Sequence, residues 1–292
     1  MPERPAARRV VKPQIAIVGA GSLATSLALA LGDAGYVIDE IISREPAASL
    51  RKARRLAEQV DASAVPVTRA QIRAGVIWFC VPDGAIASAA NSLANATGWH
   101  GKVALHASGA LTSDELAELR RRGASIASVH PLMTFVPGSQ PPLSGVPFAI
   151  EGDQKAVRAA RAIVQNLGGQ PFPIGKRHKQ AYHAWGMFVS PLLTALLAAS
   201  ERVAAAAGIR KGAGKQRALP ILRQTLANYA ALGASHSFSG PIARGDVDTI
   251  EKHLSVLRAI SEARNIYIAL ARTALRDLPG KNRVAVEKIL KK

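Results

Sequence analysis

The feature that most constrains this chain is a glycine-rich turn near its start, between an apolar strand and a helix. The run Ile15–Val18 is short, β-branched and unbroken, which is typical of a parallel strand buried on both faces. The turn that follows reads Gly19-Ala20-Gly21-Ser22-Leu23-Ala24. Gly19 permits the tight turn, Gly21 lets the backbone approach a pyrophosphate, and Ala24 lets the next helix pack close to the sheet. Because backbone N–H groups gather at this helix start, the sequence predicts a dinucleotide-binding turn; the alternative is a tight turn without a ligand.

Strands alternate with helices as far as residue 174. The expected strands are residues 15–18, 36–42, 64–67, 76–81, 102–106, 125–129, 146–151 and 170–174. This alternation predicts a doubly wound, mostly parallel sheet, so we expect a Rossmann domain of the α/β class over residues 13–174. Residues 175–292 are rich in Ala and Leu at helical spacing, which predicts an all-α C-terminal domain. Residues 1–12 are expected to form a flexible basic arm.

The first long helical stretch contains Pro191, which is expected to kink or split the helix. The apolar run Gly186–Ser200 is shorter than a membrane span, so we expect a buried helix and no membrane contact. The single cysteine, Cys80, excludes a disulfide framework, is expected in the core and fits a reducing compartment. Because the first thirteen residues lack the apolar core of a signal peptide, a cytoplasmic protein is expected.

The formal net charge of +18 is the unusual number in the composition. Such a charge attracts phosphates, whether they belong to a cofactor, a substrate or a nucleic acid. The basic residues are scattered along the chain, however, and aromatic residues make up only 4%, which disfavours a surface on which bases stack. We therefore expect solvated basic faces, with a nucleic-acid-binding surface as the weaker alternative.

The end of the second strand decides which dinucleotide is expected. In the NAD form of this fold an acidic residue ends that strand and holds the ribose 2′-hydroxyl group. Asp39 and Glu40 have suitable spacing, but apolar residues follow them and the strand end carries Ser43-Arg44, with Arg51, Lys52 and Arg54 nearby. An arginine beside a hydroxyl group suits a 2′-phosphate. We therefore expect NADP in preference to NAD; for Arg44 the alternative is an ordinary exposed side chain.

Several motifs resemble those of a known group of proteins. They are His106-Ala107-Ser108-Gly109-Ala110, His130-Pro131-Leu132-Met133-Thr134-Phe135, Phe148-Ala149-Ile150-Glu151-Gly152, Tyr182-His183-Ala184 and Ser239-Gly240-Pro241-Ile242-Ala243-Arg244-Gly245-Asp246. With the glycine-rich turn and the helical second half, they make the chain similar to the 6-phosphogluconate dehydrogenase superfamily, which includes ketopantoate reductase, pyrroline-5-carboxylate reductase and the β-hydroxyacid dehydrogenases. The chain is most similar to an uncharacterised bacterial branch, a Rossmann-like domain joined to a domain of unknown function. The resemblance implies an NADP-dependent oxidoreductase and a homodimer formed through the helical domain, but no particular substrate.

The resemblance also implies roles for individual residues. The ends of the fourth and fifth strands would flank the nicotinamide and its ribose. The candidates for cofactor binding are therefore Gly19, Ala20, Gly21, Ser22, Leu23, Ala24, Ser43, Arg44, Val81, Pro82, Asp83, His106 and Ser108. In the better-known relatives a helix supplies a Lys and, four residues later, an Asn beside the reacting carbon; here Lys179 and His183 hold these positions. Closer relatives carry a further Asn after a Ser, where this chain has Ser190-Pro191.

Reduction of a C=O or C=N group by a hydride leaves a basic atom that needs a proton. Lys179 and His183 share one helix face, so a lysine of lowered pKa could donate that proton while His183 orients the substrate. His130, which follows an apolar strand, is the third catalytic candidate, with capping or core hydrogen bonding as the alternative for it and for His106. The histidines lack the spacing of a metal site, so no metal is expected.

These observations predict an enzyme that transfers a hydride between NADP(H) and a small carbonyl or imine compound. The substrate is expected to be anionic because of the net charge and the basic run Lys176–Lys179. The alternative is a non-catalytic NADP-binding sensor or scaffold, which is favoured by Pro191 at a position where relatives carry Asn.

Overall fold

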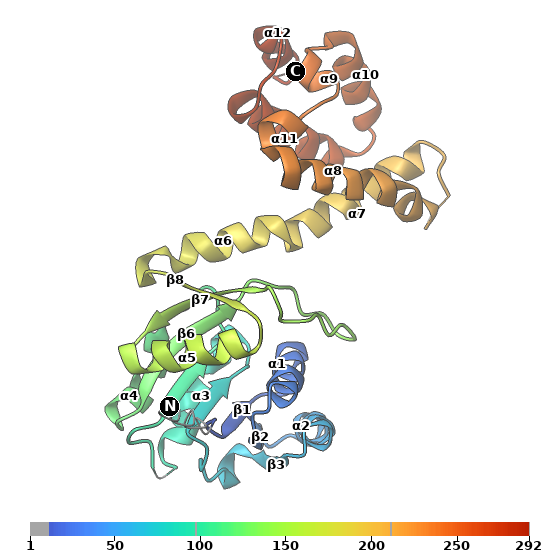
Figure 1. Cartoon of the computed structure of the whole chain (residues 1–292). Coiled ribbons are helices and arrows are strands. Elements are labelled where there is room, and N and C mark those ends of the chain that lie inside the picture. Colours follow the sequence, from blue (N-terminus) through green and yellow to red (C-terminus); the bar gives the residue numbers. More distant parts are fainter. Residues whose placement is uncertain (1–11, 97, 211, 292) are drawn as a thin grey trace, which may run out of the picture. The chain divides into compact units, whose positions relative to one another are not determined.

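The structure is a computed structural model that describes residues 12–96, 98–210 and 212–291. Within these residues eight strands form one sheet in the order β3-β2-β1-β4-β5-β6-β7-β8 (Figure 1). The strands are β1 Ile15–Val18, β2 Ile38–Ser43, β3 Ser63–Pro66, β4 Val76–Phe79, β5 Val103–His106, β6 Ser125–Pro131, β7 Pro147–Gly152 and β8 Gln170–Pro173. Neighbouring strands are parallel except β6 and β7. The expected doubly wound, mostly parallel sheet is therefore confirmed, and β1 to β6 all end at the same edge.

Each face of the sheet carries its own core. The helices that cover it are α1 Ser22–Asp33, α2 Ala47–Gln59, α3 Ile86–Ala94, α4 Ala117–Arg121 and α5 Gln154–Asn166. Ile15 and Ile17 point to the face covered by α1, α2 and α5, whereas Ala16 and Val18 point to the face covered by α3 and α4. Because successive side chains alternate between two buried faces, the strand has to be apolar throughout.

The chain after β8 is helical. Its helices are α6 Lys179–Val189, α7 Pro191–Ala206, α8 Ala213–Ser237, α9 Pro241–Arg244, α10 Val247–Leu257, α11 Ser261–Asp277 and α12 Arg283–Ile289. No strand occurs among the described residues of this part, so the expected all-α C-terminal domain is confirmed. Pro191 splits the first long helix as expected, because Ser190 leaves the helical conformation and Pro191 begins α7.

The chain divides into two compact units, Met1–Met187 and Phe188–Lys292. The first unit contains the sheet and most of α6. In the second unit, α10, α11 and α12 form a small core of apolar side chains, among them Ile250, Leu254 and Val286. Residues 1–11 of the expected basic arm lie outside the described residues.

The expectation of a buried helix over residues 186–200 is wrong. Trp185 is 52% exposed, Phe188 is 70% exposed, and Ala199 is the buried residue of α7. The apolar side chains of this stretch have few packing partners within the described chain. By length and composition alone, the helical residues Lys176–Ala206 contain a window, of mean hydropathy 1.3, that could cross a membrane, and the break at Ser190 divides these residues into α6 and α7. A single helix of this kind is weak evidence for a membrane protein.

Candidate functional site

A cavity of about 420 Å³ opens at the carboxyl edge of the sheet, where β1, β2 and β4 end. It is lined by Val18, Gly19, Ala20, Gly21, Ile42, Ser43, Arg44, Ser49, Lys52, Val67, Cys80, Val81, Pro82, Ala85, Ser88, Ala89 and Ser92. The lining brings the glycine-rich turn together with the end of β2 and with residues of α2 and α3. In open α/β sheets this edge is where ligands bind.

Gly19 and Gly21 have different tasks in the turn. Gly19 has a φ of +109°, and a β-carbon there would overlap the carbonyl oxygen of Cys80 just after β4. The glycine therefore allows two strand ends to approach each other. Gly21 precedes α1, and no described atom lies within 4 Å of the position that its β-carbon would take. Its open side leaves room for a ligand against the backbone.

The start of α1 is prepared for an anion. Among the described residues, none caps this helix with a side-chain hydrogen bond, and its first turn contains no acidic residue. The backbone N–H groups of Ser22, Leu23 and Ala24 lie in the first turn, where an α-helix offers them no acceptor. Such groups, reinforced by the helix dipole, bind phosphate.

At the end of β2, cationic side chains line the cavity, whereas the carboxylates of Asp39 and Glu40 do not. Glu40 pairs with Ala16 in the middle of the sheet, is buried, and has its pKa raised by that burial. β2 ends at Ser43, which lines the cavity with Arg44 and with Lys52 of α2. No acidic side chain belongs to the described lining. Two cations beside a hydroxyl group suit a phosphate ester better than an uncharged ribose.

Ser108, two residues beyond β5, joins three strand ends. Its hydroxyl group donates to Asp83, just after β4, over 2.9 Å. The same oxygen accepts from the N–H groups of Ala110 (3.2 Å) and Leu111 (2.9 Å). Its carbonyl oxygen accepts from the hydroxyl group of Ser128 in β6 over 3.0 Å. Ser108 thus fixes the turn after β5, and neither Ser108 nor Asp83 lines the cavity.

His106 is buried, and each of its two ring nitrogens forms a hydrogen bond within the protein. Nδ1 accepts from the N–H group of Ser108 over 3.1 Å, and Nε2 lies 2.9 Å from the carbonyl oxygen of Thr112, to which it donates. Burial lowers the pKa of His106 to about 4, which keeps the ring neutral. The side chain therefore shapes the loop after β5, in agreement with the capping alternative.

Lys179 begins α6 and is completely buried. Its Nζ donates to the carbonyl oxygen of Ser108 over 2.9 Å and to the hydroxyl group of Ser128. Burial lowers the pKa of Lys179 to about 8, against the opposing effect of Glu151 and Asp83. The lysine therefore ties the start of α6 to the ends of β5 and β6.

His130 and His183 meet beside the same loop. His130 is the penultimate residue of β6, and its Nδ1 lies 2.9 Å from the hydroxyl group of Tyr182 in α6. The ring of His183 stands edge to face with that of His130, with 6.3 Å between centroids. Both histidines are half-buried. The structure thus gathers Lys179, His183 and His130, the three catalytic candidates.

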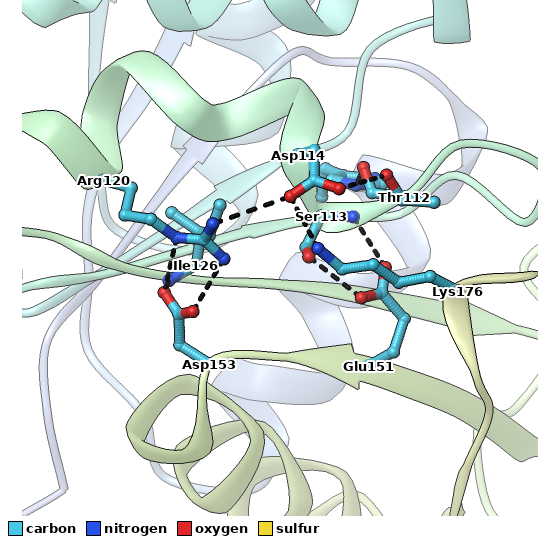
Figure 2. A network of polar contacts seen from close by, with 9 residues as sticks. Thr112, Ser113, Asp114, Arg120, Ile126, Glu151, Asp153 and Lys176 are labelled. Carbon is cyan, nitrogen blue, oxygen red and sulfur yellow. Dashed lines mark hydrogen bonds and ion pairs between the residues drawn. The ribbon is translucent and has the colours of Figure 1, made fainter.

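A second polar network anchors the segments around this group (Figure 2). Glu151, buried in β7, accepts from the N–H group of Ser113 over 2.6 Å and from its hydroxyl group over 2.9 Å. Asp114 accepts from Lys176, which precedes α6, over 2.6 Å. These bonds hold the loop after β5 against β7 and against the residues that lead into α6.

Ten of the predicted site residues fall into two groups. The cavity takes in Gly19, Ala20, Gly21, Ser43, Arg44, Val81 and Pro82, and the histidine group takes in Lys179, His130 and His183. No sequence motif assigned a role to Gly109, Tyr182 or Ser128, although the first two lie within recognised motifs. Ser128 carried a usable signal, because a polar residue inside an apolar strand needs a hydrogen-bond partner.

The fold and this edge define a two-domain protein with a Rossmann-type half followed by a helical half. One family model, described as a Rossmann-like domain, matches residues 1–131, and another, described as a domain of unknown function (DUF2520), matches residues 146–274. The chain thus joins a match to each of these two domains, one in each half. This is the pair of domains to which the sequence motifs pointed, a Rossmann-like domain joined to a domain of unknown function.

Solved structures with the same fold come from several organisms. A Bacteroides fragilis protein proposed to be an NADP oxidoreductase is 21% identical, with 90% of this chain and 97% of that chain covered and a TM-score of 0.76. The protein TM1727 from Thermotoga maritima is 23% identical, with coverage of 95% and 98% and a TM-score of 0.70. An imine reductase from Myxococcus stipitatus in complex with NADP+ is 17% identical, with coverage of 96% and 100% and a TM-score of 0.64. No curated protein matches the sequence.

Proposed function

We propose that this protein is an oxidoreductase that transfers a hydride between NADP(H) and a small carbonyl or imine compound. The observation that carries the proposal is the cavity at the end of β1 and β2. It combines the open backbone at Gly21 with two cations, Arg44 and Lys52, and contains no acidic side chain within its described lining. The Myxococcus stipitatus structure, an imine reductase with NADP+, supports the same cofactor and the imine class.

The adenosine end of the cofactor would lie at Ser43, Arg44 and Lys52, and its diphosphate at the start of α1. When bound, the reduced cofactor supplies a hydride, which carries two electrons, to the carbon of the C=O or C=N group. A proton taken from water then completes the new O–H or N–H bond. We assign His130 and His183 to the reacting group because both are half-buried at the carboxyl edge.

Lys179 has no exposed surface, so we propose that it acts as a positioning residue. Its bonds to Ser108 and Ser128 hold the loop beside the two histidines. The basic run does not support an anionic substrate, because Lys176 pairs with Asp114 and Lys179 is enclosed. The case for such a substrate rests on the net charge of +18 alone.

The proposal is tested by titrating the protein with NADPH and with NADH while following cofactor fluorescence. We expect NADPH to bind at least tenfold more tightly than NADH. Arg44→Ala should lower NADPH affinity about tenfold and Lys52→Ala several-fold, because each removes a charge-assisted bond to the 2′-phosphate, while NADH affinity stays the same. Arg55→Ala is the matched control, since Arg55 is an exposed cation of α2 that does not line the cavity. Equal affinity for the two cofactors would contradict the assignment of Arg44.

A panel of keto acids, ketones and cyclic imines, followed by NADPH absorbance, separates an enzyme from a sensor. Oxidation of NADPH with a member of the panel supports the enzyme. Tight NADPH binding with no oxidation across the panel favours the sensor or scaffold, for which Ser190-Pro191 is the sequence argument.

We also propose that the protein is a homodimer joined through its helical part. α8 has no buried residue in the described chain, and Ile221, Leu226 and Tyr229 are each 60% exposed or more. Exposed apolar side chains along one helix favour a partner surface. Sedimentation should therefore give twice the chain mass of 30.7 kDa. A mass of 30.7 kDa across the micromolar range would exclude a stable dimer.

A further inference from the structure

His130 and Tyr182 are joined across 52 residues of sequence, between β6 and α6. The Nδ1 atom of His130 lies 2.9 Å from the hydroxyl oxygen of Tyr182, and the rings meet edge to face with 5.5 Å between centroids. The ring of Phe172 in β8 packs edge to face against the ring of Tyr182, with 6.0 Å between their centroids. These contacts hold the imidazole in one orientation.

The direction of this bond depends on the tautomer of His130, and we assign the donor role to the hydroxyl group of Tyr182. Burial raises the pKa of Tyr182 to about 12, so the phenol keeps its proton at neutral pH. Within residues 12–96, 98–210 and 212–291, Nδ1 of His130 is its hydrogen-bond partner. Burial, with Lys179, His183 and His106 nearby, lowers the pKa of His130 to about 4, so this ring carries a single proton. With Tyr182 as the donor, Nδ1 accepts and the single proton of the ring is on Nε2.

The Nε2 atom of His130 faces the backbone of Gly109, in the loop after β5. A β-carbon on Gly109 would lie 2.8 Å from Nε2 of His130 and 2.9 Å from Cδ2 of His183. Gly109 has no positive φ, so the site requires its small size and not its conformational freedom. Nε2 has no hydrogen-bond partner in the described part of the chain. Both imidazole rings therefore lie next to the backbone of Gly109, which has no side chain.

We propose that His130 is a neutral hydrogen-bond donor that presents Nε2–H to the oxygen or nitrogen atom of the substrate's C=O or C=N group. Tyr182 and Gly109 are its positioning residues: Tyr182 selects the tautomer, and Gly109 leaves the space. A fixed donor at that atom stabilises the negative charge that develops there as a hydride reaches the neighbouring carbon. The identity of the substrate group rests on the proposed function.

The tautomer is read directly from long-range 1H–15N spectra of the imidazole rings in 15N-labelled protein without cofactor, with His130→Asn used to assign the signals. We expect a protonated Nε2 and an unprotonated Nδ1 in His130 between pH 6 and pH 8. Tyr182→Phe keeps the ring and removes the hydroxyl group, so the preference for Nε2–H should be lost. Tyr267→Phe is the matched control, because Tyr267 lies 3.2 Å from Nδ1 of His253 in the helical unit. It should leave His130 unchanged. A proton on Nδ1 in the unmodified protein would overturn the proposal.

Kinetics on a substrate found in the panel supply the second readout. Tyr182→Phe should lower kcat about tenfold, and Gly109→Ala about a hundredfold, while the Kd for NADPH stays within twofold. Tyr267→Phe should leave kcat unchanged. Loss of the tautomer preference with an unchanged kcat would overturn the role assigned to His130. Failure of NADPH to bind would contradict the proposed function and leave the tautomer measurement valid, so the two failures are distinguishable.

Discussion

Two regions of the sheet's carboxyl edge, one at β1 and β2 and one at β5 and β6, are built in different ways. At β1 and β2 the cavity is made of backbone, from a turn without side chains and an uncapped helix start, with Arg44 exposed beside it. At β5 and β6 the wall is made of side chains that are hydrogen-bonded within the protein, as Lys179 is to the carbonyl oxygen of Ser108 and His106 to that of Thr112. The first arrangement suits a ligand that brings its own charge. The second holds reactive groups in place before a ligand arrives.

The largest expected effect comes from Gly19→Ala, which tests the backbone-lined cavity at β1 and β2. The new β-carbon would overlap the carbonyl oxygen of Cys80 at a φ that L-residues rarely adopt, so we expect a loss of about 3–5 kcal/mol in the free energy of unfolding. Gly21→Ala is the matched control, because its surroundings are open and its φ is −87°. It should unfold like the parent in urea while NADPH affinity falls at least tenfold. Similar stability losses in both variants would contradict the division of tasks in the turn.

A smaller effect on stability is expected beside β5 and β6, from the buried charge of Lys179. Its pKa is about 8 in the folded chain and 10.5 when exposed, so between these pH values the unfolded chain binds one more proton and stability rises with pH. The rise is at most about 3 kcal/mol. Urea unfolding at pH 7.5 to 10.5 measures it, and Lys179→Met should remove this part of the pH dependence. A parent and a variant with parallel curves would show that Lys179 is not desolvated.

Much of the fold was predictable because its signals are local. The apolar run Ile15–Val18 predicted a strand buried on both faces, and both of its faces are indeed covered. The position of Ser43-Arg44 after the apolar part of β2 correctly placed both residues beside the glycine-rich turn. The apolar residues 186–200 led to the wrong prediction of a buried helix. Hydrophobicity along one helix does not reveal whether packing partners exist in the same chain.

The second site was predictable only in part. The motifs drew attention to His130, His183 and Lys179, which the structure gathers at one loop. They did not reveal that Lys179 is enclosed or that Tyr182 bonds His130. Burial and hydrogen-bond partners depend on which strands become neighbours, and β5 and β6 meet α6 only in the folded chain.

The sequence by itself determined the doubly wound sheet, the helical second half and the glycine-rich turn at the start of α1. These follow from periodicity and backbone freedom within a few residues. Only the tertiary structure decided which polar groups pair, and so which nitrogen of His130 carries the proton and which lysine loses its exposure. The pairs made by His130 and Lys179 join residues more than 50 positions apart. Their energies depend on desolvation, which no local pattern encodes.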